Sequence, residues 1–223
     1  MYYTLIHRKY NRKGVFIIKN IIFDVDGTLW DTTEVVAKAW NMAIAEAGGT
    51  KTFITADMLK KEFGKPMDKI ADNLFYDADH EHKELLLEKC CIYEHEALSD
   101  NKDNLLFPEV KETLKKLSGK YGLFIVSNCQ SGYIELFMEK AGVEKYITDF
   151  ECFGDTGKSK GENIKLIIER NNLEDVIYVG DTQGDYEATV FAGIPFVFAK
   201  YGFGKVEDCY LAINGINELL NLE

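Results

Sequence analysis

Two aspartates two positions apart lie in the run Asp24-Val25-Asp26-Gly27-Thr28, directly after an apolar stretch. A second pair of acids, Asp181 and Asp185, follows another apolar stretch much later in the chain. Carboxylates held close together repel each other unless a cation or a shared proton lies between them. Four carboxylates that converge on one point are typical of a site for a hard divalent cation, and an all-oxygen ligand set favours Mg²⁺. We therefore predict a Mg²⁺ site formed by Asp24, Asp26, Asp181 and Asp185.

Short apolar runs precede these polar clusters and predict the strands that would position them. The runs are rich in β-branched and aromatic residues, as strands buried on both faces are, and lie at 21–23, 123–126, 176–179 and 195–199. Segments of helical period alternate with them, at 109–118, 131–141, 162–171 and 184–192. This alternation predicts an α/β fold with a Rossmann-like, doubly wound parallel sheet. Ligands bind beyond the carboxyl ends of such strands, where the acids and Ser127-Asn128 would lie.

The interval between the first two predicted strands is too long for a simple crossover. It carries apolar residues at helical spacing in four stretches, at 33–47, 56–63, 67–76 and 81–98. A helical insertion at this place would lie over the strand ends as a lid. The predicted organisation is an N-terminal extension at 1–19, a catalytic core at 20–30 and 108–223, and an inserted α-helical cap at 31–107.

Composition limits the partners that the protein can have. The formal net charge is −11, which repels nucleic acid and acidic membrane surfaces, so we expect neither as a partner. No apolar run is long enough to predict a membrane span. The five cysteines form no disulfide framework or zinc-ligand spacing, which is typical of reduced thiols in a cytoplasmic protein. Residues 1–19 are basic and predict either an extra strand at 15–18 or an arm for a partner.

Four motifs in their order along the chain resemble those of the haloacid-dehalogenase-like hydrolases. They are Asp24-Val25-Asp26-Gly27-Thr28, Ser127-Asn128, Lys160-Gly161-Glu162-Asn163 and Gly180-Asp181-x-x-x-Asp185. The resemblance covers residues 20 to about 200. The predicted helical insertion is similar to the cap of the branch that contains phosphoglycolate phosphatase and β-phosphoglucomutase.

The resemblance implies a role for each motif residue. Asp24 would be the nucleophile that forms an aspartyl phosphate, and Asp26 the general acid and base. Mg²⁺ would be held by Asp24, by the backbone carbonyl of Asp26 and by Asp181, with Asp185 either in the metal shell or orienting a lysine. The phosphoryl oxygens would be bound by Ser127 and by backbone N–H groups of Gly27 and Asn128.

One lysine would neutralise the phosphoryl charge, and two positions compete for this role. Lys160 opens the predicted helix 162–171 and resembles one form of the third motif. Lys158 fits the spacing of the other form, and we keep it as a substrate-binding candidate beside the preferred Lys160.

The acid at position 26 implies cleavage of phosphate monoesters, because an alkoxide leaving group must be protonated. The leading hypothesis is therefore a Mg²⁺-dependent phosphatase, a phosphoric monoester hydrolase acting on a small phosphorylated metabolite. A β-phosphoglucomutase-like sugar-phosphate mutase and a non-catalytic protein that binds a phosphorylated ligand are the alternatives. The cap lysines 60, 61, 65 and 69 would either bind substrate or form a solvated helix face. The substrate and the oligomeric state are not predicted.

Overall fold

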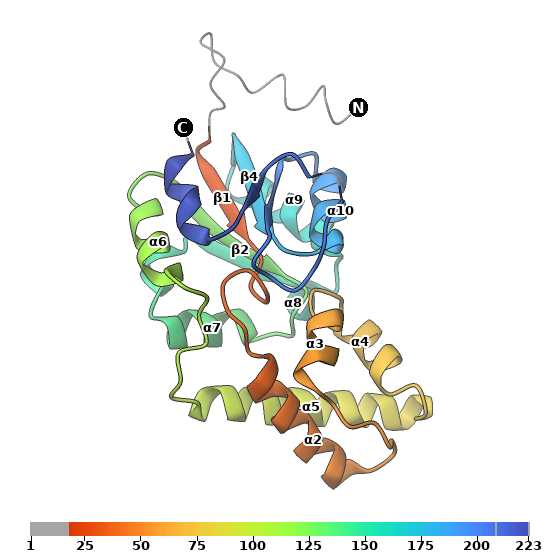
Figure 1. The fold of residues 1–223 in the computed structure, drawn as a ribbon. Helices are drawn as coiled ribbons and strands as arrows, with labels where there is room; N and C mark the ends of the chain where they lie inside the picture. Colours follow the sequence, from red (N-terminus) through yellow and green to blue (C-terminus); the bar gives the residue numbers. More distant parts are fainter. Residues whose placement is uncertain (1–17, 208, 223) are drawn as a thin grey trace.

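The computed structural model describes residues 18–207 and 209–222, in which a six-stranded sheet lies beside a group of helices (Figure 1). The strands are β1 (Asn20–Phe23), β2 (Gly122–Ser127), β3 (Asp149–Cys152), β4 (Val176–Gly180), β5 (Phe196–Ala199) and β6 (Ala212–Ile213). All pairs are parallel, in the order β3-β2-β1-β4-β5-β6. The strand order reverses direction between β1 and β4, which places a binding crevice at their carboxyl ends. The predicted α/β class and doubly wound parallel sheet are confirmed.

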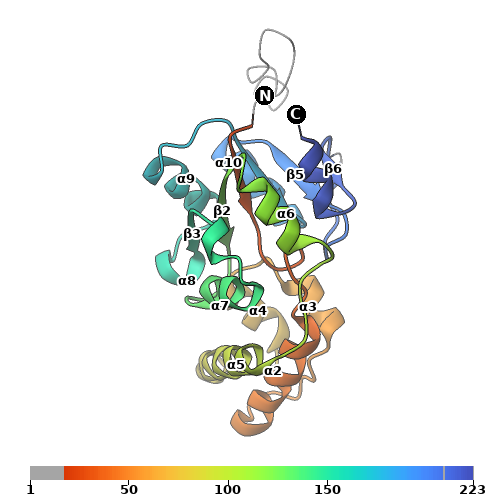
Figure 2. The ribbon, with the colours of Figure 1, turned by 90° about the vertical axis from the view of Figure 1, so that its left-hand side faces the viewer.

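Helices cover both faces of this sheet because each strand is apolar on both sides. Ile21 and Phe23 of β1 enter one apolar cluster, whereas Ile22 between them enters the other. The first cluster also contains residues of α6 (Val110–Leu117), α7 (Tyr133–Ala141) and the 3-10 helix η2 (Ile216–Asn221). The second contains residues of α9 (Lys160–Arg170) and α10 (Gln183–Ala192), which lie on the opposite face (Figure 2). Two short helices, η1 (Glu144–Tyr146) and α8 (Phe153–Thr156), complete the connections.

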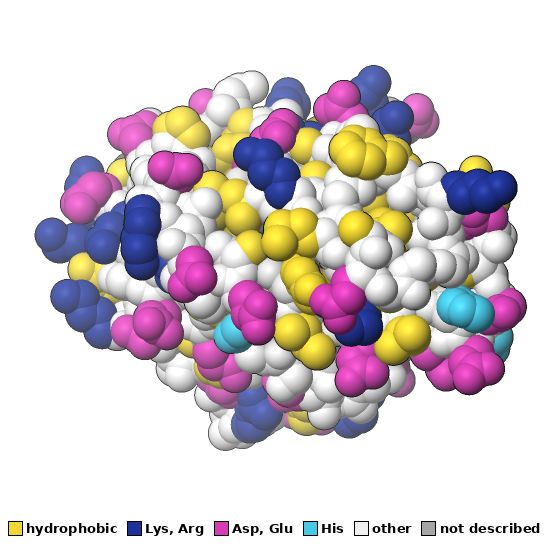
Figure 3. Space-filling model, turned by 90° about the horizontal axis from the view of Figure 1, so that it is seen from below, with side chains coloured by type: hydrophobic (Ala, Val, Ile, Leu, Met, Phe, Trp, Pro, Cys, Tyr) yellow, Lys and Arg dark blue, Asp and Glu magenta, His cyan; other side chains and the backbone are white. Residues whose placement is uncertain are grey.

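A group of helices between β1 and β2 lies beyond the carboxyl ends of the strands (Figures 1 and 2). It consists of α2 (Thr33–Ala47), α3 (Ala56–Glu62), α4 (Met67–Leu74) and α5 (His80–Asp100). Trp40 of α2 is fully buried in its interior, 6.2 Å from the ring of Phe75. Figure 3 views the molecule from this end, where acidic, basic and apolar side chains are interspersed. We call residues 31–107 the helical segment.

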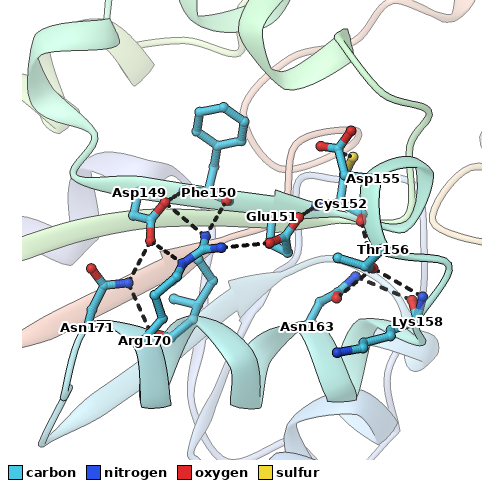
Figure 4. Close-up of polar contacts among 11 residues, drawn as sticks. Asp149, Phe150, Glu151, Cys152, Asp155, Thr156, Lys158, Asn163, Arg170 and Asn171 are labelled. Atoms are coloured by element: carbon cyan, nitrogen blue, oxygen red, sulfur yellow. Dashed lines mark hydrogen bonds and ion pairs between the residues drawn. The ribbon is translucent and has the colours of Figure 1, made fainter.

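The predicted elements match the observed ones closely. Every predicted helix is present within two residues of its predicted ends, and each of the four strands predicted at 21–23, 123–126, 176–179 and 195–199 is present within one. Strands β3 and β6 were not predicted. β3 is an edge strand with two acids, Asp149 and Glu151, and Arg170 of α9 binds both of them and the Phe150 carbonyl (Figure 4). Its charged side chains conceal the apolar pattern by which buried strands are recognised.

The N-terminal prediction falls mostly outside the described residues. Of the strand expected at 15–18, residues 15–17 lie outside them, and Ile18 belongs to no strand. Lys19 forms ion pairs with Glu174 and Asp175 at the start of β4. In the described part of the chain, no helix is both long enough and apolar enough to cross a membrane.

Candidate active site

Asp24 follows β1 directly and stays in line with the sheet, since its backbone N–H donates to the Val179 carbonyl of β4 at 2.9 Å. The chain then turns sharply at Gly27, whose φ of +81° lies in the left-handed region that favours glycine. A β-carbon on Gly27 would lie 2.3 Å from Asp181 Oδ2. Glycine at this position therefore allows the turn after β1 to pack directly against the acid after β4.

Asp181 is fully buried and is held by three donors. Its Oδ2 accepts from the backbone N–H groups of Phe203 at 2.7 Å and Gly204 at 3.3 Å. Its Oδ1 accepts from the Thr28 hydroxyl at 3.3 Å. The loop after β5 thus orients Asp181 from one side, and the turn after β1 orients it from the other.

Asp185 lies in the first turn of α10, and both of its oxygens are hydrogen-bonded. Oδ2 accepts from the backbone N–H and the hydroxyl of Thr182, which caps the helix, and from Asp181 N. Oδ1 accepts from Lys160 Nζ at 2.5 Å and from the Tyr178 hydroxyl at 3.3 Å. These contacts make Asp185 a support for the helix terminus and for Lys160.

Lys160 begins α9 and points into the site. Its Nζ lies 2.9 Å from Asp24 Oδ1 and 2.5 Å from Asp185 Oδ1, and all three side chains are buried. Ser159 caps the helix through a reciprocal pair of hydrogen bonds with Glu162, which fixes the direction in which residue 160 leaves the backbone.

Lys158, the other candidate, lies outside this cluster. It precedes the cap residue and is exposed, and its backbone groups contact Thr156 and Asn163 (Figure 4). Within the described residues its ammonium group forms no ion pair. The helix cap therefore directs residue 160 inward and leaves residue 158 on the surface.

Burial disfavours the ionised form of the acids at this point of the molecule. It raises the pKa of Asp24 to about 6 although the charge of Lys160 opposes the shift, and it raises the pKa of Asp181 to about 8. Burial also raises the pKa of Asp26 well above its ordinary value. Burial alone would lower the pKa of Lys160, but the charges of Asp185 and Asp24 outweigh it and the net shift is upward. Among the described residues Lys160 pairs with Asp24 and Asp185 only, and the ionisation of the buried Asp24, Asp26 and Asp181 is favoured by further positive charge.

The donor set fits a hard divalent cation. Carboxylate oxygens of Asp24, Asp181 and Asp185 lie within 4.8 Å of one another. Asp24 Oδ2 is buried and has no hydrogen-bond partner among the described residues. An oxygen-only cluster of carboxylates is typical of sites for hard divalent cations.

Ser127 is the last residue of β2, and Asn128 follows it. Ser127 is buried, and it lines a pocket together with Asp26. The Asn128 side chain instead reaches the helical segment, where its Nδ2 donates to the Gly64 carbonyl at 2.8 Å. Its Oδ1 is buried without a partner in the described part of the chain. Asn128 thus connects the sheet to the loop between α3 and α4.

Three further residues of the pocket were not predicted from the sequence. The Tyr133 hydroxyl donates to Asp26 Oδ1 at 2.7 Å. Glu94 of α5 is 3% exposed, and it accepts a hydrogen bond from Gln130 Nε2 at 3.0 Å. Tyr133 and Glu94 lie in amphipathic helices where the periodic pattern predicts packing. The one available signal was a glutamate on the apolar face of the predicted helix 81–98.

Trp30 packs at the joint between the two parts of the molecule. Its ring makes edge-to-face contacts with Tyr133 and Phe137, and it borders a cavity beside residues 101–106, where the helical segment returns to the sheet.

Comparison with known proteins supports a family assignment. Residues 21–199 match the sequence pattern of the haloacid dehalogenase-like hydrolases. The phosphoglycolate phosphatase of Nitrosospira multiformis is 30% identical, with 86% of this chain and 88% of that protein covered. The phosphoglycolate phosphatase of Escherichia coli is 27% identical, with 91% of each chain covered.

A solved structure of a haloacid dehalogenase-like family hydrolase from Streptococcus pneumoniae shares the fold. Its TM-score is 0.79 at 19% identity, with 92% of this chain and 97% of that chain covered. The chain therefore belongs to the haloacid dehalogenase-like hydrolases, in the phosphatase branch that also contains the phosphoglycolate phosphatases.

Proposed function

We propose that this phosphatase uses Asp24 as a nucleophile to hydrolyse a small phosphate monoester in a Mg²⁺-dependent reaction. The observation that carries the proposal is the state of the Asp24 carboxylate. Lys160 holds its Oδ1, whereas its Oδ2 is buried and unpartnered among the described residues. A carboxylate that is both fixed in position and short of donors is suited to attack an electrophile.

The chain's own groups account for both half-reactions. An oxygen of Asp24 attacks phosphorus, the bond to the leaving oxygen breaks, and Asp26 gives that oxygen its proton. Asp26 then takes a proton from water, whose oxygen attacks the aspartyl phosphate and releases phosphate from Asp24. The raised pKa of Asp26 suits the first of these roles, because it favours the protonated form of the carboxyl. The Tyr133 hydroxyl holds the Asp26 side chain in place.

The proposed Mg²⁺ ligands are Asp24, Asp181 and the backbone carbonyl of Asp26. When bound, the cation would offset the charge between the phosphoryl oxygens and the carboxylates. We assign Asp185 to positioning Lys160, because donors already occupy both of its oxygens. Lys160 remains charged and would stabilise the phosphoryl group as negative charge spreads over it.

The helical segment at residues 31–107 is proposed to act as a cap over the site. Phosphoryl oxygens would be bound by Ser127 and by the backbone N–H groups of Gly27 and Asn128. Phosphoglycolate, after which the relatives are named, is the first metabolite to test. A cytoplasmic location stays a prediction from the cysteines, which are all free thiols in the structure.

Hydrolysis of an aryl phosphate with and without Mg²⁺ tests the proposal. We expect turnover that EDTA abolishes, and no turnover in Asp24→Asn, which keeps the size of the side chain but removes its nucleophilic charge. Asp57→Asn, an exposed acid in the first turn of α3, is the matched control and should remain active. Equal rates in the wild type and Asp24→Asn would contradict the assignment of the nucleophile.

A further inference from the structure

A pocket lies between the strand ends and the helical segment, over the proposed catalytic residues. Asp26 and Ser127 contribute to its lining from the strand ends, and Met67, Ile70 and Glu94 contribute from α4 and α5. The cavity itself is about 20 Å³, room for about one water molecule, and it opens to solvent. The part of a substrate beyond the phosphate would extend from this cavity toward its opening.

Glu94 is the acid that the helical segment contributes to this pocket. Its Oε2 accepts from Trp40 Nε1 at 2.7 Å, and its Oε1 accepts from Gln130 Nε2 at 3.0 Å. Each carboxylate oxygen has two lone pairs, so each keeps one acceptor position beyond these bonds. Asn128 Oδ1, also in the lining, is a second acceptor without a partner among the described residues. The pocket therefore offers unused acceptors.

Positive charge for a second anion is scarce in the same lining. Lys65 is the only positively charged side chain among the described residues that line the pocket. Its side chain is 44% exposed, and its Nζ lies 2.8 Å from Glu62 Oε2. Lys160 is already held by Asp24 and Asp185. Arg170 is the only arginine among the described residues, and it forms ion pairs with Asp149 and Glu151 of the edge strand β3 (Figure 4).

We propose that Glu94 selects phosphate monoesters whose leaving group carries a hydroxyl or amino donor and no second anionic group. The inference rests on the proposed function, since it concerns the pocket of that same site. A donor on the leaving group would satisfy the acceptors of Glu94 and Asn128. A carboxylate or second phosphate there would lie beside the Glu94 carboxylate without a committed cation. Activities are compared at pH 8, above the pKa of about 7 to which burial raises Glu94, so that this carboxylate is charged.

A substrate panel for the wild-type enzyme gives the first test. The probes are glycerol 2-phosphate and ribose 5-phosphate for hydroxyl donors, phosphoethanolamine for an amine, phosphoglycolate for a second anion, and an aryl phosphate for the chemistry alone. We expect kcat/KM for the better of the hydroxyl and amine classes to exceed that for phosphoglycolate at least about tenfold, the effect of one charged hydrogen bond. The ranking of the two classes identifies the donor.

The variant Glu94→Gln tests the residue itself. The Gln130 amide can rotate to present its oxygen to the new amide, so the contact with the sheet is retained. We expect the advantage over phosphoglycolate, measured as a ratio of kcat/KM values within each protein, to shrink about tenfold. Glu88→Gln, an exposed acid on the same helix, is the matched control and should leave the ratio unchanged.

The outcomes separate the inference from the function on which it rests. No aryl phosphate turnover in the wild type would defeat the proposed function. Turnover of aryl phosphate together with a preference for phosphoglycolate would overturn the inference alone. Loss of phosphoglycolate hydrolysis in Lys65→Met would also overturn it, because Lys65 would then bind the second anion. An unchanged ratio in Glu94→Gln would remove Glu94 from substrate selection.

Discussion

Lys160 is surrounded by carboxylates, and its two ion pairs are almost completely shielded from water. Charges that are buried and paired depend on one another, because removing one partner leaves the other without compensation. This dependence distinguishes Lys160 from Lys158, which is only two residues away along the chain but exposed.

Replacing Lys160 by Met should therefore affect both stability and activity. We expect a loss of about 3 kcal/mol in the free energy of unfolding in EDTA. We also expect kcat to fall at least about a hundredfold, because the phosphoryl charge loses a fixed cation. Lys158→Met should change the free energy of unfolding by no more than about 0.5 kcal/mol. Urea unfolding and aryl phosphate kinetics would measure both effects, and equal behaviour of the two variants would refute the assignment of Lys160.

The sequence predicted those site residues whose role depends on short spacing at the end of a strand. Asp24 and Asp26 lie two apart, and Asp181 and Asp185 four apart, so each pair can be recognised locally. The choice between Lys158 and Lys160 depends on where Ser159 caps α9, and lysine spacing does not determine this. Tyr133 and Glu94 reach the pocket only through the packing of separate helices, which a single sequence does not specify.

At the scale of elements, the loop after β5 completes the site. Its backbone donors at Phe203 and Gly204 hold Asp181, and Gly202 before them fits tightly. A β-carbon on Gly202 would lie 2.3 Å from the Gly27 carbonyl oxygen and 2.3 Å from Asp181 Cβ. Both contacts are with parts of the site that are fixed by the sheet, so the loop itself would have to move.

Gly202→Ala should accordingly weaken the site through its backbone. We expect a loss of about 1–3 kcal/mol in the free energy of unfolding, as for other overpacked positions, and a higher Mg²⁺ concentration for half-maximal activity. Gly184 in α10 is the control, since the nearest atom to its added β-carbon is Thr182 Oγ1 at an ordinary 3.6 Å. Gly184→Ala should be neutral or stabilising by up to about 1 kcal/mol. Thermal unfolding and Mg²⁺ titration of activity would show whether the two glycines differ.

The helices and strands were largely predictable, because the spacing of apolar residues and the residues that begin or end an element are local properties of the sequence. The exceptions, β3 and β6, lie towards or at the edges of the sheet. β3 alternates acids with apolar residues and relies on Arg170 from α9, and β6 contains only two residues. Both depend on partners that are distant in the sequence.

At the scale of the whole molecule, a few polar contacts join the helical segment to the sheet domain. Asn128 binds the Gly64 carbonyl, Gln130 binds Glu94, and Lys140 Nζ donates to the Ser99 carbonyl at 2.7 Å. The ring of Phe63 lies 6.5 Å from that of Phe203. Among these contacts, the hydrogen bond from Gln130 to Glu94 involves a buried ionisable group. The protonation of Glu94 therefore affects the stability of the whole protein.

Burial raises the pKa of Glu94 from 4.5 to about 7, although hydrogen bonds from Gln130 and Trp40 oppose the shift. Between these values the unfolded chain loses the proton and the folded protein keeps it. The folded state therefore binds more protons, and the Glu94 contribution to the free energy of unfolding falls as pH rises. The stabilisation is fully present below about pH 4.5 and is lost by about pH 7, a change of about 3 kcal/mol.

Glu94→Gln removes this titration and leaves the other carboxyl groups in place. We expect the free energy of unfolding of the variant, minus that of the wild type, to increase between pH 5 and pH 8 by about 2–3 kcal/mol. Urea unfolding of both proteins in EDTA at several pH values measures the difference directly, and shared contributions cancel. Glu88→Gln, which alters an exposed acid on the same helix, is measured in parallel as the control for losing one carboxylate. A pH-independent difference for Glu94→Gln would mean that Glu94 titrates in the folded protein as it does in the unfolded chain, and burial would then not govern its charge.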